Sequence, residues 1–424
     1  MVCRCGVVLV EYSCAAKNQA RPGRSGPPSV VAQGIDNEKV GPAEDGAMVV
    51  PNGQLLRPAG ESLAFGGRPV DLALSPDGAT LYAKDNRGLL VLDTATWKLR
   101  QTLPKYFGLA FGDADPSSNR ILQEYEEQQF LNPEIDKLVA IRKTELQGEL
   151  YDTVLFGDQP VSYPRPFLFG IRPLADHPNY SASRQISHAL CLYDNAGEHF
   201  LPGSDTTASP VTRHLALSRV LLYLFDPTQD PRFRAACQGK TSDPQMRDRA
   251  RTLRQETVLL EAADRIRRHA GLSQNAKHGR PLVVVVTKYD AWSSLFEDDS
   301  VLPNPWGRLS GTQINALNTA EVERVSQRVR ALLWRLTPEL VSAAEGFAQE
   351  VIYIPVSAVG RGPEVDPATG MLGVRPRDIS PVWVEVPLLY SLCRWMNGII
   401  PRHKPTGPLK VVAADDGDLR ETGS

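Results

Sequence analysis

The sequence lacks membrane-length apolar runs, paired cysteines and a strong net charge. The run VVLVEY at 7–12 is far shorter than a membrane span, and Glu11 makes it a poor signal-peptide core. Six cysteines lie scattered through 424 residues without a CxxC pair, which argues against a disulfide-dense scaffold and a paired-cysteine zinc site. A net charge of -2 gives no global reason to expect nucleic acid as a partner. We therefore expect a cytoplasmic protein without a membrane span.

The composition is that of an ordinary globular chain, with 42% hydrophobic and 23% charged residues. Its length is enough for more than one domain. Residues 1–60 are rich in Gly, Pro, Ala, Ser and charge without apolar periodicity, so we predict a mostly disordered tail. We divide the rest into a β-rich segment at 61–103, an α/β domain at 104–404 and a disordered tail at 405–424.

The segment at 61–103 alternates strand-like runs with the turn signals SPDG and DNRG. It predicts four short strands, at Val70–Leu74, Thr80–Ala83, Leu89–Leu92 and Trp97–Gln101. The pattern resembles one blade of a β-propeller of the YVTN or WD type, although no second copy follows and propellers need several blades. A second interpretation makes Thr94–Leu103 a helix capped by Thr94 or Thr96 and fed directly by a strand at Leu89–Asp93.

From Tyr106 onward, strands alternate with helices, which predicts a mainly parallel sheet with helices on both faces. Strands are expected at Phe107–Phe111, Phe167–Ile171, His188–Asp194, Arg219–Asp226, 282–286 and Glu350–Pro355, with the second and third forming an antiparallel pair. Helices are expected at Ser117–Phe130, Pro244–Ala270, Thr319–Phe347 and Val384–Gly398.

The first motif that could carry chemistry is LCLYDNAGEHF, in which Asp194, Gly197 and Glu198 follow an apolar strand. A carboxylate at a strand end can hold Mg²⁺ through water, and a glycine three residues later lets a backbone N–H approach a γ-phosphate. The alternative is an ordinary strand-to-loop turn, because DxxG alone is common.

Two further motifs also follow strands. Thr287, Lys288 and Asp290 come after PLVVVV, where a carboxylate can accept two hydrogen bonds from the NH/NH₂ edge of guanine and a lysine stem can lie along the base. In IPVSAVG at 354–360, Ser357 and Ala358 could present backbone N–H groups to the guanine carbonyl. Each motif alone is equally compatible with a plain strand end.

Together and in this order, the three motifs resemble the nucleotide motifs of the TRAFAC-class, Ras-like GTPases. DNAGE matches the DxxG motif, TKYD the NKxD motif and SAV the weaker SAK motif. The resemblance covers about 105–400, and the wide motif spacing is most similar to bacterial double-GTPase type domains. It implies a P-loop NTPase type fold that binds GTP or GDP with Mg²⁺.

The resemblance also implies residue roles. Asp290 would read guanine, Lys288 would brace the base and sugar, and Asp194 with Gly197 would sense Mg²⁺ and the γ-phosphate. Glu198 stands where Ras-like enzymes carry the water-positioning glutamine. A carboxylate near phosphate is repulsive unless it is protonated or turned away, so the chain departs from the pattern here.

The phosphate-binding loop, GxxxxGK[ST], is missing. Gly239-Lys240-Thr241 mimics its end, but Arg234 replaces the first glycine and the order of motifs is wrong. We hypothesise that the blade replaced the loop, with TATWKLRQTLP serving both as blade strand and as first helix. In that case Leu89–Leu92 should lie in the main sheet beside 190–194 and 282–286.

Without this loop, triphosphate binding loses its N–H cradle and its lysine, so we expect poor or absent GTP hydrolysis. The main expectation is a guanine-nucleotide-binding, GTPase-like protein, with a protein partner engaged through the GTPase-like fold or the blade. The alternatives are a degenerate scaffold or regulatory module, a propeller-type interaction protein, and a truncated or fused gene product.

Overall fold

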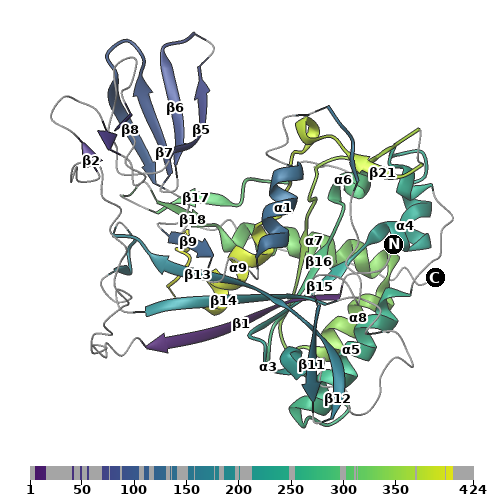
Figure 1. Cartoon of the computed structure of the whole chain (residues 1–424). Coiled ribbons are helices and arrows are strands. Elements are labelled where there is room, and N and C mark those ends of the chain that lie inside the picture. Colours follow the sequence, from purple (N-terminus) through teal and green to yellow (C-terminus); the bar gives the residue numbers. More distant parts are fainter. Residues whose placement is uncertain are drawn as a thin grey trace, which may run out of the picture.

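The computed structural model describes the following residues: 5–15, 41–42, 48–49, 55–56, 69–75, 77–85, 88–104, 109–113, 119–129, 134, 136–140, 151–156, 158–175, 177–180, 186–195, 200, 213–247, 254–296, 302–309, 312, 314–367, 370–396 and 398–403. The predicted tail at 405–424 lies outside them. The described part forms a mixed α/β body and a separate four-stranded antiparallel sheet (Figure 1).

A seven-stranded mixed sheet forms the centre of the α/β body (Figure 1). In spatial order its strands are β19 (Val351–Pro355), β16 (Leu282–Val286), β15 (Val220–Phe225), β1 (Cys5–Ala15), β14 (Ile186–Asp194), β13 (Pro166–Pro173) and β9 (Leu109–Asp113). The first three pair in parallel, and every other neighbouring pair is antiparallel. The expected parallel arrangement is therefore confined to one side of the sheet.

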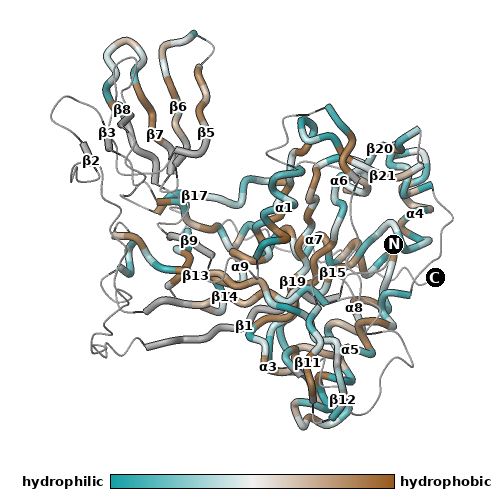
Figure 2. The backbone as a smooth tube through the Cα atoms, viewed as in Figure 1, coloured by the Kyte–Doolittle hydropathy of each residue, from teal (hydrophilic) through white to brown (hydrophobic). Residues whose placement is uncertain are grey.

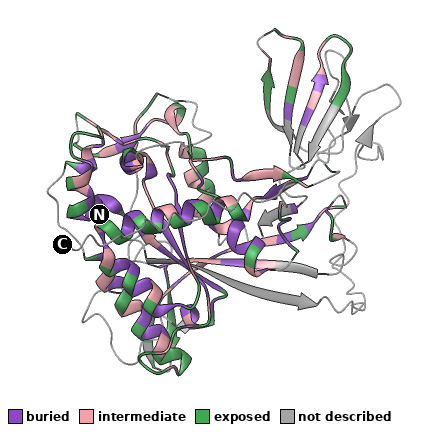
Figure 3. Ribbon diagram, turned by 180° about the vertical axis from the view of Figure 1, so that it is seen from behind, coloured by how far each residue is buried: buried purple, intermediate pink, exposed green. Residues whose placement is uncertain are grey.

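The parallel strands hold the main core because their side chains are apolar on both faces. All five residues of β16 are buried, and Val283, Val284 and Val286 are fully so. Such continuous apolar runs are typical of parallel strands covered on both sides. Figure 2 shows hydrophobic residues concentrated along the central strands, and Figure 3 shows the buried residues meeting there.

The described helices are α1 (Arg120–Gln129), α3 (Arg213–Leu217), α4 (Pro231–Ala236), α5 (Gln255–Ala270), α6 (Tyr289–Trp292), α7 (Thr319–Leu336), α8 (Pro338–Phe347) and α9 (Val386–Trp395). Helix α5 packs on α8, α8 packs on α7, and α7 packs on β19. Two expected helices differ from the structure. The one expected from Pro244 begins at Gln255, and the one expected at 319–347 is divided at Thr337 because Pro338 starts a new helix. None of the described helices is both long and apolar enough to span a membrane.

Smaller elements complete the described chain. They comprise two hairpins, β11 (Tyr151–Phe156) with β12 (Gln159–Pro164) and β17 (Trp306–Arg308) with β18 (Asn315–Leu317). They also include the sheet of β10 (Val139–Ala140), β21 (Leu372–Val374) and β20 (Glu364–Val365), and the sheet of β2 (Gly41–Pro42), β3 (Met48–Val49) and β4 (Leu55–Leu56). Four short 3₁₀ helices are described: η4 (Pro227–Gln229), η5 (Pro244–Met246), η6 (Ser293–Leu295) and η7 (Pro376–Asp378).

The four strands expected at 61–103 are confirmed. They are β5 (Pro69–Leu74), β6 (Thr80–Asp85), β7 (Gly88–Asp93) and β8 (Lys98–Pro104), paired in sequence order. Side chains of directly paired residues lie on the same face of the sheet. Ala83, Leu90 and Leu92 form a small buried cluster on one face of this four-stranded sheet.

The helix interpretation of Thr94–Leu103 is wrong. Asp93 accepts hydrogen bonds from the N–H groups of Ala95 and Thr96, which closes a turn in place of a helix start. Trp97 then takes a positive φ of 51° before β8 pairs with β7. Leu89–Leu92 consequently lie in the four-stranded sheet, so the blade has not donated the missing strand of the main sheet.

The N-terminal segment supplies a central strand of the main sheet. Strand β1 lies between β14 and β15 and is antiparallel to both, although we had expected residues 1–60 to be mostly disordered. Since β14 and β15 both oppose β1, they run in the same direction as each other. The carboxyl ends of β14, β15, β16 and β19 therefore lie at one edge of the sheet, which we call the carboxyl edge.

Candidate functional site

Three parallel strands bring residues that are distant in sequence to the carboxyl edge. Phe225, Val286 and Pro355 are level in the register of β15, β16 and β19. The residues that follow each strand therefore share one location, as ligand sites in open α/β sheets commonly do. Asp226, Lys288 and Ser357 lie in these three loops.

Lys288 is anchored by an acidic turn. Its Nζ donates to Asp226 Oδ2 at 2.8 Å and to Thr228 Oγ1 at 2.9 Å. Asp226 also accepts from the Thr228 N–H and hydroxyl, which makes it the N-cap of η4. This anchor directs the lysine head toward β15, and the expected role of Lys288 in bracing a base and sugar stays a prediction.

Sequence reasoning missed Asp226 and Thr228. The available signal was the Asp-Pro-Thr turn immediately after an apolar strand, since Asp before Pro favours turn initiation. Gln255 supports this turn from the start of α5. Its side-chain amide accepts from the Asp226 N–H and donates to the Asp226 carbonyl, both at 2.8 Å.

Asp290 and Ser357, which are 67 residues apart, are in direct contact. The Ser357 hydroxyl donates to Asp290 Oδ1, and the Gly360 N–H donates to Ser357 Oγ at 2.8 Å. Asp290 is half-buried, and a carboxylate has about four acceptor positions, so it can accept further hydrogen bonds. The TKYD and SAV motifs thus form one constellation.

The role expected for the Ser357 backbone is wrong. Its N–H donates to the Val382 carbonyl at 2.9 Å, which occupies the group that was to face guanine. Thr287 has a structural role in the described contacts, because its N–H and hydroxyl both bond to the Phe225 carbonyl, at 2.9 and 3.0 Å. The exposed Ala358 adjoins Ser357 at this edge.

A further carboxylate, Asp243, adjoins the site. It is only 4% exposed and accepts from the Gln245 N–H at the start of η5. A Cβ built on Gly362, in the loop after Ser357, would lie 3.2 Å from three atoms of Asp243, so the two loops are in close contact. Nothing in the sequence near Asp243 indicated this long-range contact.

Asp243 has an unusual electrostatic environment. Burial raises the pKa of its carboxyl, and the neighbouring carboxylates of Asp290 and Asp226 add to the rise. The Gln245 N–H and the charge of Lys288 oppose it. Asp226, which pairs with Lys288, and Asp290 both act electrostatically on Asp243, and we call these three residues the carboxylate group.

The DxxG side of the predicted site is described only at its beginning. Asp194 ends β14 at the carboxyl edge, opposite Val7 of β1. Three strand spacings, about 14 Å, separate β14 from β16. Gly197 and Glu198 lie outside the described residues.

The described residues do not provide a magnesium-binding cluster. Among them, no group of three or more His, Cys, Asp or Glu side chains is placed to hold a metal ion. Asp194 is the one predicted Mg²⁺ ligand in the described chain, and a single carboxylate needs other oxygen donors to complete the shell of this ion. The described residues thus do not by themselves fit a resident metal.

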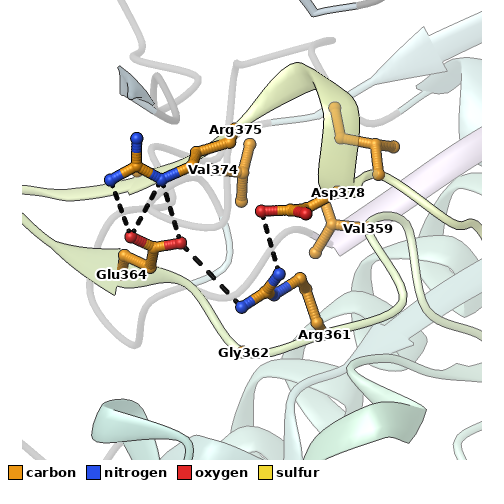
Figure 4. Close-up of a pocket in the computed structure, with 9 residues that line it drawn as sticks. Val359, Arg361, Gly362, Glu364, Val374, Arg375 and Asp378 are labelled. Carbon is orange, nitrogen blue, oxygen red and sulfur yellow. Dashed lines mark hydrogen bonds and ion pairs between the residues drawn. The ribbon is translucent and has the colours of Figure 1, made fainter. Parts of the chain in front are cut away.

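A small pocket lies beside the Ser357 loop (Figure 4). Its volume is about 10 Å³, room for one water molecule, so it cannot hold a base. Arg361 reaches Asp378 at 2.9 Å and Glu364 at 3.9 Å, while Arg375 pairs with Glu364 at 3.0 Å. These ion pairs tie the Ser357 loop to β20, β21 and η7.

Comparison of the chain with known proteins assigns no family to it. No family model, no curated protein and no solved structure matches the chain. Any assignment of function therefore rests on the residues of the site.

Proposed function

We propose that this protein carries a guanine-recognition site of Ras-like GTPase type whose capacity to hydrolyse GTP is weak or absent. The observation that carries the proposal is the contact between Asp290 and Ser357 at the carboxyl edge. The serine hydroxyl fixes one carboxylate oxygen and leaves acceptor positions for the ring N–H and exocyclic NH₂ of guanine. Charge-assisted hydrogen bonds of this kind are stronger than neutral ones.

Two neighbouring groups would complete the base site. The Ala358 backbone N–H is proposed to donate to the guanine carbonyl in place of the occupied Ser357 N–H. The Lys288 stem would lie against the base, while its ammonium group stays bound to Asp226 and Thr228. In this proposal Thr287 supports the strand end and makes no contact with the ligand.

The order of elements also supports the proposed Ras-like descent. Strands β14, β15, β16 and β19 share a direction, and the motifs follow β14, β16 and β19 in chain order. Asp194, Gly197 and Glu198 keep their proposed places on the phosphate and Mg²⁺ side, with Glu198 in the water-positioning place. Strand β1, which lies between β14 and β15, runs in the opposite direction and fills the position where the strand before the phosphate loop is expected.

Binding measurements with an Asp290→Asn variant test the base site. We expect the wild-type chain to bind guanosine in preference to adenosine in isothermal titration, because only guanine offers an adjacent N–H and NH₂. The side-chain amide of the variant would place an NH₂ against the guanine NH₂ and should weaken guanosine binding by about tenfold or more, while favouring xanthosine, which carries a carbonyl there.

The charge-matched control for this test is Asp264→Asn. Asp264 lies on α5 about 13 Å along the axis from Gln255, and its side chain is 53% exposed. Equal guanosine affinity in wild type and Asp290→Asn would contradict the proposal. Tight, Mg²⁺-dependent GTP binding with turnover would contradict the proposed loss of hydrolysis.

The four-stranded sheet favours a second function, the binding of a protein partner. Leu72 and Leu74 on β5 and Leu99 on β8 are 62%, 60% and 45% exposed, and they share the face of the buried Leu92 cluster. Apolar side chains exposed in this way often mark interaction sites. We propose a cytoplasmic location on the ground that Cys191, Cys237 and Cys393 are buried free thiols.

A further inference from the structure

At the carboxyl edge, the region between β14 and β15 is where a phosphate-binding loop would be expected. It differs from such a site because the strand there, β1, runs in the opposite direction. A phosphate loop is delivered by the carboxyl end of its strand, where free N–H groups face the ligand. Because β1 is antiparallel to β14 and β15, its carboxyl end at Ala15 lies at the opposite edge, away from Lys288. The end of β1 that reaches the carboxyl edge is Cys5.

The backbone of β1 is also engaged on both sides. Val7, Val8 and Leu9 each have partners on β14 and on β15. Strand pairing on two sides uses the N–H and C=O groups that could otherwise contact an anion. This segment therefore offers no cradle of N–H groups for a phosphate chain.

The charged groups near Asp290 also disfavour the binding of a phosphate chain. The carboxylate group contributes three acidic side chains near one another, and the ammonium group of Lys288 is bound to one of them, Asp226. A further cation at the acidic turn is Arg234, and its guanidinium donates to the Thr228 carbonyl at 2.9 Å. Lys288 and Arg234 are thus committed to protein acceptors, against the three acidic side chains of the carboxylate group.

Asp243 lies where its charge can affect a ligand bound at Asp290. It is buried at the contact between the η5 segment and the Gly362 loop, and the same loop holds Ser357 against Asp290. Asp290 already acts electrostatically on Asp243, so a phosphate chain on a base at Asp290 would bring further negative charge to a group of carboxylates. In a partly buried site such repulsion is less screened than on an open surface.

We propose that the Asp290 site takes guanine in unphosphorylated form, as the free base or nucleoside, and that Asp243 disfavours ligands that carry a phosphate chain. The inference rests on the proposed guanine site and specifies its ligand class. It reverses the usual preference of a GTP-binding site, in which the phosphates contribute most of the affinity.

Titrations of the full chain with guanosine, GMP, GDP and GTP test the inference, with and without Mg²⁺. We expect guanosine to bind at least as tightly as GMP, and affinity to fall further with each added phosphate. In Asp243→Asn, the ratio of guanosine to GTP affinity should fall by at least about fourfold, which is the effect of one pair of unit charges on the order of 10 Å apart in a half-solvated site. Asp264→Asn, with its exposed charge removed, should leave the ratio unchanged.

The outcomes separate this inference from the proposed function. GTP or GDP binding more tightly than guanosine would overturn the inference and leave the guanine site standing. If Asp243→Asn is folded by circular dichroism and leaves the ratio of guanosine to GTP affinity unchanged, the inference is likewise overturned and the guanine site still stands. No binding of any guanine ligand, or binding that Asp290→Asn leaves intact, would overturn both.

Discussion

The two halves of the seven-stranded sheet differ in strand direction, and this difference determines which half can form a binding site. In the parallel half, β15, β16 and β19 end at the same edge, so their following loops meet and bring Asp226, Lys288 and Ser357 together. In the other half, β1 and β13 run in the opposite direction, so only alternate loops reach that edge. The parallel half can form a binding site because its loops converge, and the individual motifs contribute less to this than the strand direction does.

The largest expected effect tests whether β1 is a central strand. Val8→Pro removes a backbone N–H from a strand paired on both sides, so we expect a loss of about 3 kcal/mol in the free energy of unfolding. Urea unfolding followed by circular dichroism measures it. Val8→Thr keeps the N–H and a β-branched side chain and is the control. Equal stabilities of the proline and threonine variants would remove β1 from the sheet and with it the contrast between the halves.

The next effect concerns the anchor of Lys288 in the parallel half. Lys288→Met leaves the Asp226 carboxylate, whose side chain is 17% exposed, without its cation. We expect a loss of about 1–3 kcal/mol in the free energy of unfolding, below that of a fully buried pair. Adding Asp226→Asn should restore part of the loss, because the unpaired charge is then gone. Strictly additive effects of the two substitutions would show that the ion pair contributes nothing.

A smaller effect separates the site from its supporting fold. Ser357→Ala removes the donor to Asp290 and the acceptor of the Gly360 N–H, which should cost about 1–2 kcal/mol in the free energy of unfolding and weaken guanosine binding. Ser326→Ala is a matched control in the same half, because the buried Ser326 hydroxyl accepts from the Tyr353 N–H at 2.9 Å. That variant should lose stability without losing relative affinity. Equal binding losses in both variants would make Ser357 merely structural.

The sequence was informative where local pattern alone decides structure. Strand β16 and the turn-separated strands β5 to β8 were predicted because apolar runs and turn residues specify them. The contact between Asp290 and Ser357 was predictable only in part. Strand order brings the two loops together, but the bridge between Ser357 and Val382, which occupies the Ser357 N–H, depends on a loop 25 residues away.

The remaining features depend on contacts between distant segments. Strand β1 lies within a region whose Gly, Pro and Ser content masks it, and its place is set by the open edges of β14 and β15. Asp243 has no motif around it, and its importance arises from the Gly362 loop more than 100 residues later. Propensity and spacing cannot report such long-range pairings.

The smallest expected effect is a change in pH dependence that involves the carboxylate group. Because the folded-state pKa of Asp243 lies above its ordinary value of 3.8, its proton stabilises the folded protein at acid pH. That contribution is lost as the pH rises through the raised pKa. Asp243→Asn keeps an oxygen to accept from the Gln245 N–H but carries no proton to lose. Its stability relative to wild type should therefore increase from pH 4 towards pH 7.

Urea unfolding of both proteins at several pH values measures this difference. Asp226, Asp290 and Lys288, which face Asp243, are present in both proteins, so the comparison isolates Asp243 and its coupling to them. A difference that is constant with pH would mean that Asp243 is solvated in solution and that the η5 segment does not close on the Gly362 loop. The carboxylate group in the parallel half would then be open to solvent. Its charges would have little effect on whether the site binds a phosphorylated ligand.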